Sequence, residues 1–215
     1  MSRSSKSNKK LPNPKYFSIL AEIEIIHLKE MMSSINLYLK GVQDDIKATA
    51  EKAKPEQYDS KHEYLSRMDS LTDELIQIKE VEDISKKLVT IGLYMIVENI
   101  TKRIFKWLYY DLDERTKKKK IWILYKWDML KKELYNLCNF DLSDVSEYSI
   151  VNELRCLNSV IKHSGYVDKC LSFFFNWQSD LGKEIDTKKI DLDKFCESIP
   201  KYIHDLAKKI RENFA

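Results

Sequence analysis

The sequence predicts an all-α protein, a helical bundle, and three observations lead to that prediction. Glycine and proline number only four each among 215 residues, far fewer than turn-rich β architectures need. Apolar residues recur at three- and four-residue steps over long stretches, which is the period of an α-helix. The chain is 43% apolar and 33% charged, a composition typical of a soluble globular protein with room for a sizeable core.

The first helix is expected over residues 15–53, after a disordered basic tail at residues 1–14. Pro12 and Pro14 end the tail, and Pro55 stops the helix. The apolar positions that predict the helix are Leu20, Ile23, Met31, Ile35, Tyr38, Val42 and Ile46. A helix of more than thirty residues either projects as an arm or packs along the whole core. We therefore expect residues 15–80 to form a helical arm or extension.

A second helix, predicted over residues 60–79, completes this extension. Residues 81–215 are expected to form the helical core domain. A third helix is predicted over residues 83–112, and its apolar centre is typical of a helix inside a bundle. A fourth helix is predicted over residues 121–138. The highly charged DLDERTKKKK stretch before it indicates a connector, and its lysine run at 117–120 is read as a solvated loop, with RNA backbone contact as the alternative.

A fifth helix is expected to begin near Ser146, which can cap it, and to end at Gly165. Residues 166–192 are ambiguous: CLSFFFNWQ fits a helical turn, a strand or a packed loop. The alternation in EIDTKKIDL predicts at most a minor β element near residues 183–192. A last helix is predicted over residues 193–212.

The four cysteines show neither a CxxC pair nor metal-ligand spacing, so we expect buried free thiols and no metal or cofactor. No secretory signal is recognisable, and five polar or charged residues interrupt the longest apolar run, at 88–110. The prediction is a cytoplasmic protein without a membrane partner.

The segment VNELRCLNSVIKHSG, residues 151–165, gathers four polar side chains on one part of the fifth helix. At about 100° per residue, Arg155, Asn158, Lys162 and His163 spread over about 140° of the helix surface. Such a set suits cleavage of RNA without a metal. Histidine exchanges protons near neutral pH, and the two cations stabilise the charge of a phosphorane. The alternative interpretation is an ordinary solvated helix face.

The stretch NELRCLNSVIKHSG resembles the signature helix of the HEPN superfamily, the higher eukaryotes and prokaryotes nucleotide-binding domains, and IVENITKRIFK resembles an earlier core helix of such domains. The resemblance covers about residues 85–165. It implies a bundle of four or five helices, a homodimer and a metal-independent endoribonuclease of a toxin–antitoxin or antiphage-defence system, with an antitoxin or regulatory protein as a further partner.

The resemblance assigns Arg155 and His163 as the catalytic pair, Asn158 and Lys162 as RNA contacts, and Glu98 as the residue that orients Arg155. Seven residues separate Arg155 from His163, whereas four to six are usual in that family. The alternative function is a non-catalytic helical module that binds RNA, binds another protein or dimerises. Phe173, Phe174 and Phe175 indicate packing in a core or a dimer interface, with base stacking as the alternative.

Overall fold

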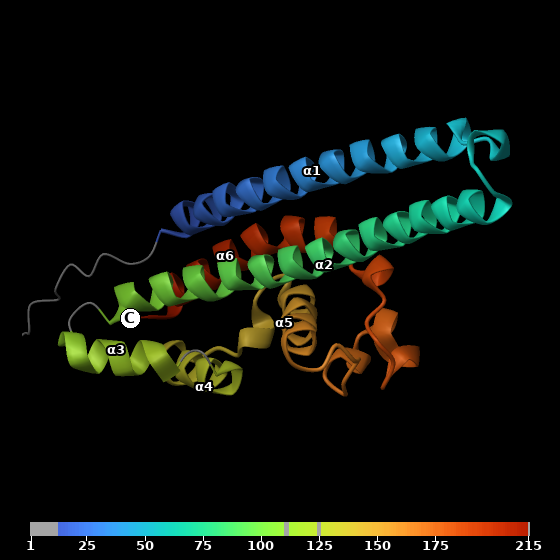
Figure 1. Ribbon diagram of the computed structural model, residues 1–215. Coiled ribbons are helices and arrows are strands. Elements are labelled where there is room, and N and C mark those ends of the chain that lie inside the picture. Colours follow the sequence, from blue (N-terminus) through green and yellow to red (C-terminus); the bar gives the residue numbers. More distant parts are fainter. Residues whose placement is uncertain (1–12, 110–111, 124–125, 215) are drawn as a thin grey trace, which may run out of the picture.

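A computed structural model describes residues 13–109, 112–123 and 126–214, and within them the protein is an all-α helical bundle, as predicted. Figure 1 shows two long antiparallel helices, with α6 between them in this view and the helices α3, α4 and α5 on the far side of α2 from α1. The α-helices are α1 (Pro14–Lys52), α2 (Lys61–Leu108), α3 (Glu114–Ile123), α4 (Trp127–Cys138), α5 (Tyr148–His163) and α6 (Leu192–Asn213). The basic tail predicted at residues 1–14 lies almost entirely outside the described residues.

Local chemistry sets the ends of α1 and α2. The side chain of Asn13 accepts hydrogen bonds from the first turn of α1, and Pro14 follows as the first helical residue. Ser60 accepts a bond from the backbone N–H of Glu63, and the Glu63 carboxylate reaches back to the N–H of Asp59. The prediction of two separate helices over residues 60–79 and 83–112 is wrong, because α2 continues through residues 80–82 without a break.

Two hydrophobic clusters hold the long hairpin. The larger one joins the first half of α1 and the second half of α2 to α4, α5 and α6. The smaller one lies in the distal half of the hairpin, around Leu39, Ile46, Leu71 and Ile78. The helical extension predicted over residues 15–80 therefore has two parts. The start of α1 packs on the main core, and only the distal half reaches beyond it (Figure 1).

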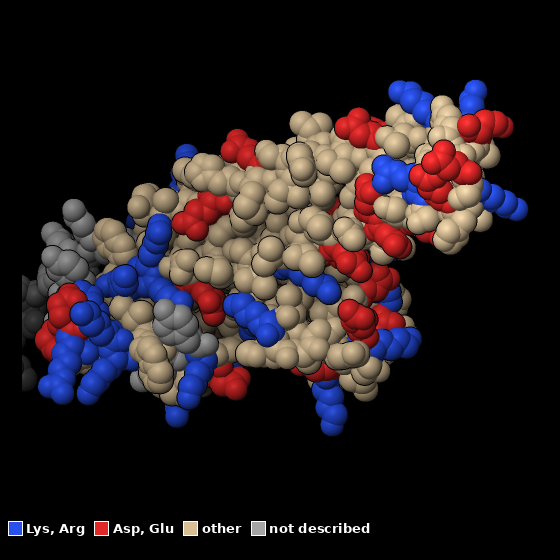
Figure 2. Space-filling model, viewed as in Figure 1, with Lys and Arg blue, Asp and Glu red and all other residues tan. Residues whose placement is uncertain are grey.

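The charged stretch before the predicted fourth helix is itself helical. α3 includes all four lysines of residues 117–120, so the prediction of a loop there is wrong. The nitrogen of Lys120 lies 3.3 Å from the carboxylate of Glu133 on α4. Figure 2 shows blue side chains gathered at the end of the molecule where Figure 1 places α3.

The segment between α5 and α6 contains short 3-10 helices and one isolated antiparallel bridge, between Tyr166 and Glu184. The minor β element expected near residues 183–192 is thus reduced, among the described residues, to a single bridge. The aromatic run gives two of these short helices, η3 (Leu171–Phe173) and η4 (Phe175–Asp180). Trp177 is buried, whereas Phe173 and Phe175 are 82% and 87% exposed, so the core packing expected of the phenylalanines fails for these two.

The last helix, α6, begins after Asp191, whose carboxylate accepts a hydrogen bond from the N–H of Lys194. It packs against α1, α2, α4 and α5, and nine of its residues are buried. Among the described residues, no helix is long and apolar enough to cross a membrane.

Candidate functional site

Helix α5 carries the predicted motif and packs between α2 and α6. Two hydrogen bonds to α6 fix the residues that precede its first turn. The carboxylate of Asp205 accepts the N–H of Ser146 at 2.8 Å, and the hydroxyl of Ser198 donates to the carboxylate of Glu147 at 3.3 Å. Glu147, rather than the predicted Ser146, is the capping residue. The helix ends at His163, and Gly165 then takes a φ of +72°, a conformation that glycine adopts without strain.

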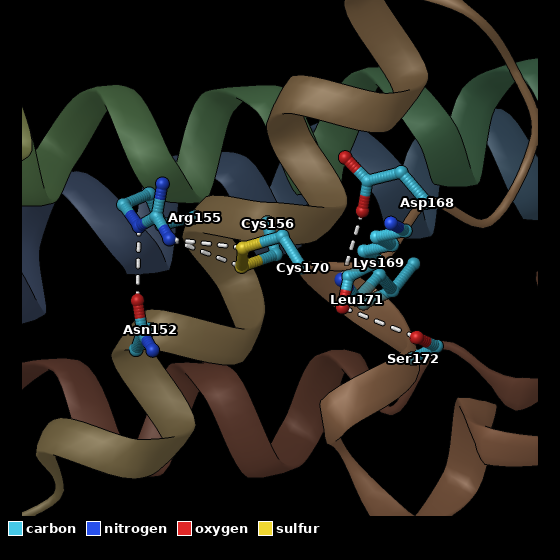
Figure 3. The surroundings of a disulfide bond; sticks show 8 residues. All are labelled: Asn152, Arg155, Cys156, Asp168, Lys169, Cys170, Leu171 and Ser172. Atoms are coloured by element: carbon cyan, nitrogen blue, oxygen red, sulfur yellow. Dashed lines mark hydrogen bonds between the residues drawn. A yellow bond between two sulfur atoms is a disulfide. The ribbon is translucent and has the colours of Figure 1, made fainter.

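Arg155 is half-buried and surrounded by protein groups (Figure 3). Its Nε donates to the side-chain oxygen of Asn152 at 2.9 Å, and one terminal nitrogen lies 3.2 Å and 3.0 Å from the sulfurs of Cys156 and Cys170. Its guanidinium carbon lies 5.4 Å from the ring centroid of Trp127, in a cation–π contact with α4. The guanidinium is therefore held in place by three elements of the fold.

Asn158 is buried and lies on the core side of α5 rather than on an open surface. Its side-chain oxygen has no hydrogen-bond partner among the described residues, and the same is true of the hydroxyl of Tyr202, which is fully buried on α6. Burial raises the pKa of Tyr202 above its usual range, and the neighbouring hydroxyls of Tyr94 and Tyr148 add to that shift. Asn158 thus sits in the packed interior, away from the surface where RNA would bind.

Lys162 and His163 are exposed in the last turn of α5. At about 1.5 Å of rise per residue, His163 lies about 12 Å further along the helix axis than Arg155. The two side chains of the predicted catalytic pair are therefore more than two helical turns apart on one protomer.

Glu98 lies on the side of α2 that faces α4 and lines a small cavity with Tyr94 and Trp127. The cavity has a volume of about 10 Å³, which is enough room for about one water molecule. Burial raises the pKa of Tyr94, the charge of Glu98 raises it further, and the charge of Arg155 opposes that shift. Both charged groups are thus neighbours of the Tyr94 hydroxyl, although no ion pair between Glu98 and Arg155 is found among the described residues.

The structure corrects the reading of the cysteines as free thiols. Cys156 on α5 and Cys170, just before η3, form a disulfide, while Cys138 and Cys196 are free and buried. The described residues hold no cluster of His, Cys, Asp or Glu side chains that could bind a metal ion. The motif therefore divides into three parts: an interior amide, a guanidinium bound at a disulfide, and an exposed lysine and histidine at the helix end.

Sequence reasoning missed a second candidate surface, on the outer side of α1. Tyr16, Ile19, Ile23 and Ile26 are spaced three, four and three residues apart and are 41–51% exposed. Leu37, two heptads after Ile23, is 74% exposed. We call these five residues the α1 seam. The buried residues of the same helix (Phe17, Ala21 and Ile25) lie on its opposite side, and the signal was already present as two apolar series in one helix.

A second stripe of exposed apolar residues lies on α2: Val81, Ile84, Leu88 and Met95. In Figure 2 few charged side chains interrupt the surface over the middle of α1 and α2. Scattered exposed apolar residues are normal on a protein surface, but a stripe along one helix indicates a surface that another chain can cover.

No protein-family model, no curated protein and no solved structure matches this chain.

Proposed function

We propose that the protein is a helical interaction module that dimerises by pairing the α1 seam with the same seam of a second copy. The observation that carries the proposal is the heptad spacing of the first four seam residues, Tyr16, Ile19, Ile23 and Ile26. Apolar residues at alternate steps of three and four are what a helix needs to pack along a second helix as a coiled coil. The seam lies opposite the buried face of α1, and its first four residues are 41–51% exposed within the part of the chain that the structure describes.

The charges beside the seam favour a parallel, in-register pair. In heptad terms Tyr16 and Ile23 occupy a, Ile19 and Ile26 occupy d, and Glu22 and His27 flank them at g and e. A parallel pair brings Glu22 of one copy beside His27 of the other. An antiparallel pair that aligned the same four apolar layers would bring the two Glu22 carboxylates together, which is unfavourable.

The energetic scale agrees with a weak, concentration-dependent dimer. Because the four side chains Tyr16 to Ile26 are about half-buried already, complete burial gains roughly 1 kcal/mol each, or about 8 kcal/mol for the eight of a pair. Lost translational and rotational freedom offsets at least about 4 kcal/mol of this gain. The remaining gain of at most about 4 kcal/mol corresponds to a dissociation constant of about 1 mM or above, so we expect association only at high protein concentration.

Sedimentation velocity over a wide range of protein concentrations tests the proposal. The wild type is expected to shift from monomer to dimer, and Ile23→Glu is expected to remain monomeric while keeping its helical content. Leu65→Glu, which places the same charge on an α2 residue of similar exposure (47% against 45% for Ile23) outside both stripes, is the matched control and should dimerise like the wild type. Leu88→Glu tests the α2 stripe and should also leave the dimer intact.

A cysteine crosslink tests the orientation of the pair. Ile23→Cys should form an intermolecular disulfide under oxidation, because an a position faces its own copy across a parallel seam. Leu88→Cys should not. A wild type that stays monomeric at the highest concentration, or a dimer that Leu88→Glu abolishes and Ile23→Glu spares, would contradict the proposal.

Metal-independent RNA cleavage is the second candidate function, and the exposure of Lys162 and His163 at the end of α5 favours it. The fixed position of Arg155 and the burial of Asn158 favour the interaction module instead. Incubation of total RNA and purified transfer RNA with the protein in EDTA discriminates between them. Discrete products from the wild type that disappear in His163→Ala would establish cleavage at this helix end, whereas equal products from both would exclude His163 as the catalytic group.

A further inference from the structure

We propose that Cys156 and Cys170 form a reversible redox pair whose reactive thiolate is stabilised by Arg155. The two residues come from different elements: Cys156 is buried within α5, and Cys170 is half-buried just before η3. Their Cα atoms are 5.8 Å apart, so the bond can form and break without a change in the backbone around it. Cys170 is the more exposed of the two residues, so it is the one that we expect a soluble oxidant or reductant to reach.

Arg155 supplies the charge that makes such a pair reactive. The guanidinium is permanently positive, and one terminal nitrogen points to both sulfurs, 3.2 Å and 3.0 Å away (Figure 3). A fixed cation at this distance favours the thiolate over the thiol, and the thiolate is the nucleophile in exchange reactions. Because Asn152 and Trp127 hold the guanidinium, it remains beside the sulfurs when the disulfide opens.

The other charged groups near the pair do not cancel this effect. The carboxylate of Asp168 accepts the backbone N–H of Leu171 at 2.8 Å and lies on the far side of Cys170 from Arg155 (Figure 3). Glu98, whose charge acts on the Tyr94 hydroxyl, forms no ion pair with Arg155 among the described residues. Lys169, next to Cys170, adds positive charge.

The two remaining cysteines provide an internal comparison. Cys138 and Cys196 are buried, and burial raises the pKa of Cys138 to about 11 and that of Cys196 above its usual value. Neither receives a hydrogen bond from an arginine among the described residues. We expect these two thiols to be inert where Cys170 reacts.

The reaction balances with a low-molecular-weight disulfide, such as oxidised glutathione, as the oxidant. The thiolate of Cys170 attacks one glutathione sulfur, forms a mixed disulfide and releases one glutathione thiolate. The thiol of Cys156 then loses its proton and attacks the sulfur of Cys170, which releases the second glutathione. The protein loses two electrons and two protons, and the oxidant becomes two thiols.

The bond ties η3 to α5, so its state decides how firmly the following aromatic segment is held. Phe173 and Phe175, among the most exposed apolar side chains described, follow Cys170 by three and five residues. In the reduced protein the covalent tie is lost, and we expect residues 170–175 to exchange their amide protons faster.

The proposal is tested by two measurements on the full chain. In the first, the protein is equilibrated in glutathione buffers of graded ratio, quenched with an alkylating agent and analysed by mass spectrometry. A redox pair gives a reversible change from bonded to doubly alkylated Cys156 and Cys170 within the range of these buffers. A bond that survives every buffer in the folded protein would be a purely structural disulfide and would overturn the proposal.

In the second measurement, the reduced protein reacts with iodoacetamide at pH 7, and alkylation of Cys170 is compared between variants. Arg155→Gln should slow it by up to about tenfold, because the thiolate fraction falls when the fixed cation is removed. Lys162→Gln removes a cation seven residues further along the same helix and should leave the rate unchanged. Arg155→Lys, which keeps the charge, should recover part of the rate, and equal rates in wild type and Arg155→Gln would refute the role of the guanidinium.

Discussion

The carboxylate of Glu153 is the strongest candidate for a single group that anchors α5. It is 5% exposed and accepts two hydrogen bonds from distant elements. The indole N–H of Trp177, which belongs to η4 and is 1% exposed, donates to it at 3.0 Å, and the ammonium of Lys194 on α6 donates at 2.9 Å. One carboxylate therefore joins α5 to two other parts of the fold.

Glu153→Ala is expected to destabilise the protein by roughly 1–4 kcal/mol. The buried indole N–H loses its acceptor, which costs about 1–3 kcal/mol. Lys194 is 34% exposed and can turn to water, so its share is small, about 1 kcal/mol or less. Glu153→Gln keeps an acceptor for Trp177 and loses only the charge, so we expect it to cost less than about 1.5 kcal/mol.

Urea denaturation monitored by circular dichroism measures both free energies of unfolding, provided that the transitions are two-state. Tryptophan fluorescence reports whether the site of Trp177 has opened. The control is Glu184→Ala, because Glu184 has a 72% exposed side chain and only a 4.0 Å ion pair with Lys87. A loss of less than about 0.5 kcal/mol in Glu153→Ala, equal to that of the surface control, would refute the anchoring role.

Two further predictions follow from buried polar groups. Tyr202→Phe removes a hydroxyl that has no hydrogen-bond partner among the described residues. We therefore expect this variant to be as stable as the wild type, or more stable by up to about 1 kcal/mol, in the same urea assay. A loss of more than about 1 kcal/mol in the free energy of unfolding would contradict the prediction. The stability of the wild type should fall as pH rises above about 9, because burial raises the pKa of Tyr94, Tyr109 and Cys138 and the folded state then retains protons that the unfolded chain releases. The urea midpoint at pH 7 and pH 10 measures this fall, and a midpoint unchanged between them would contradict it.

The ends of helices were predictable because they depend on residues close together in the chain. Pro14 begins α1 and Gly165 follows the end of α5, and Asp191 caps α6 within one or two residues of the expected start. The break expected between residues 79 and 83 was wrong because no proline or glycine interrupts that stretch. In such a stretch helix propensity continues unless packing opposes it.

The four polar residues of α5 could be placed on one helix from the sequence, but their partners could not. Arg155 meets Cys170 and Trp127, which lie fifteen and twenty-eight residues away in the chain, and Asn158 turns out to face the interior. Helical spacing gives the angle between side chains on one element. Helical spacing does not indicate which other element of the fold packs against that part of the helix surface.

By itself the sequence determined that this protein is helical, where most helices begin and end, and which residues crowd on α5. Only the tertiary structure decided which of the two apolar series on α1 is buried: Phe17, Ala21 and Ile25 face the core, and Ile19, Ile23 and Ile26 remain outside. Both series have the spacing of a helix face, so the local sequence pattern does not indicate which of the two is buried. The choice depends on the neighbours that α2 and α6 provide, and these are set by the packing of the whole chain.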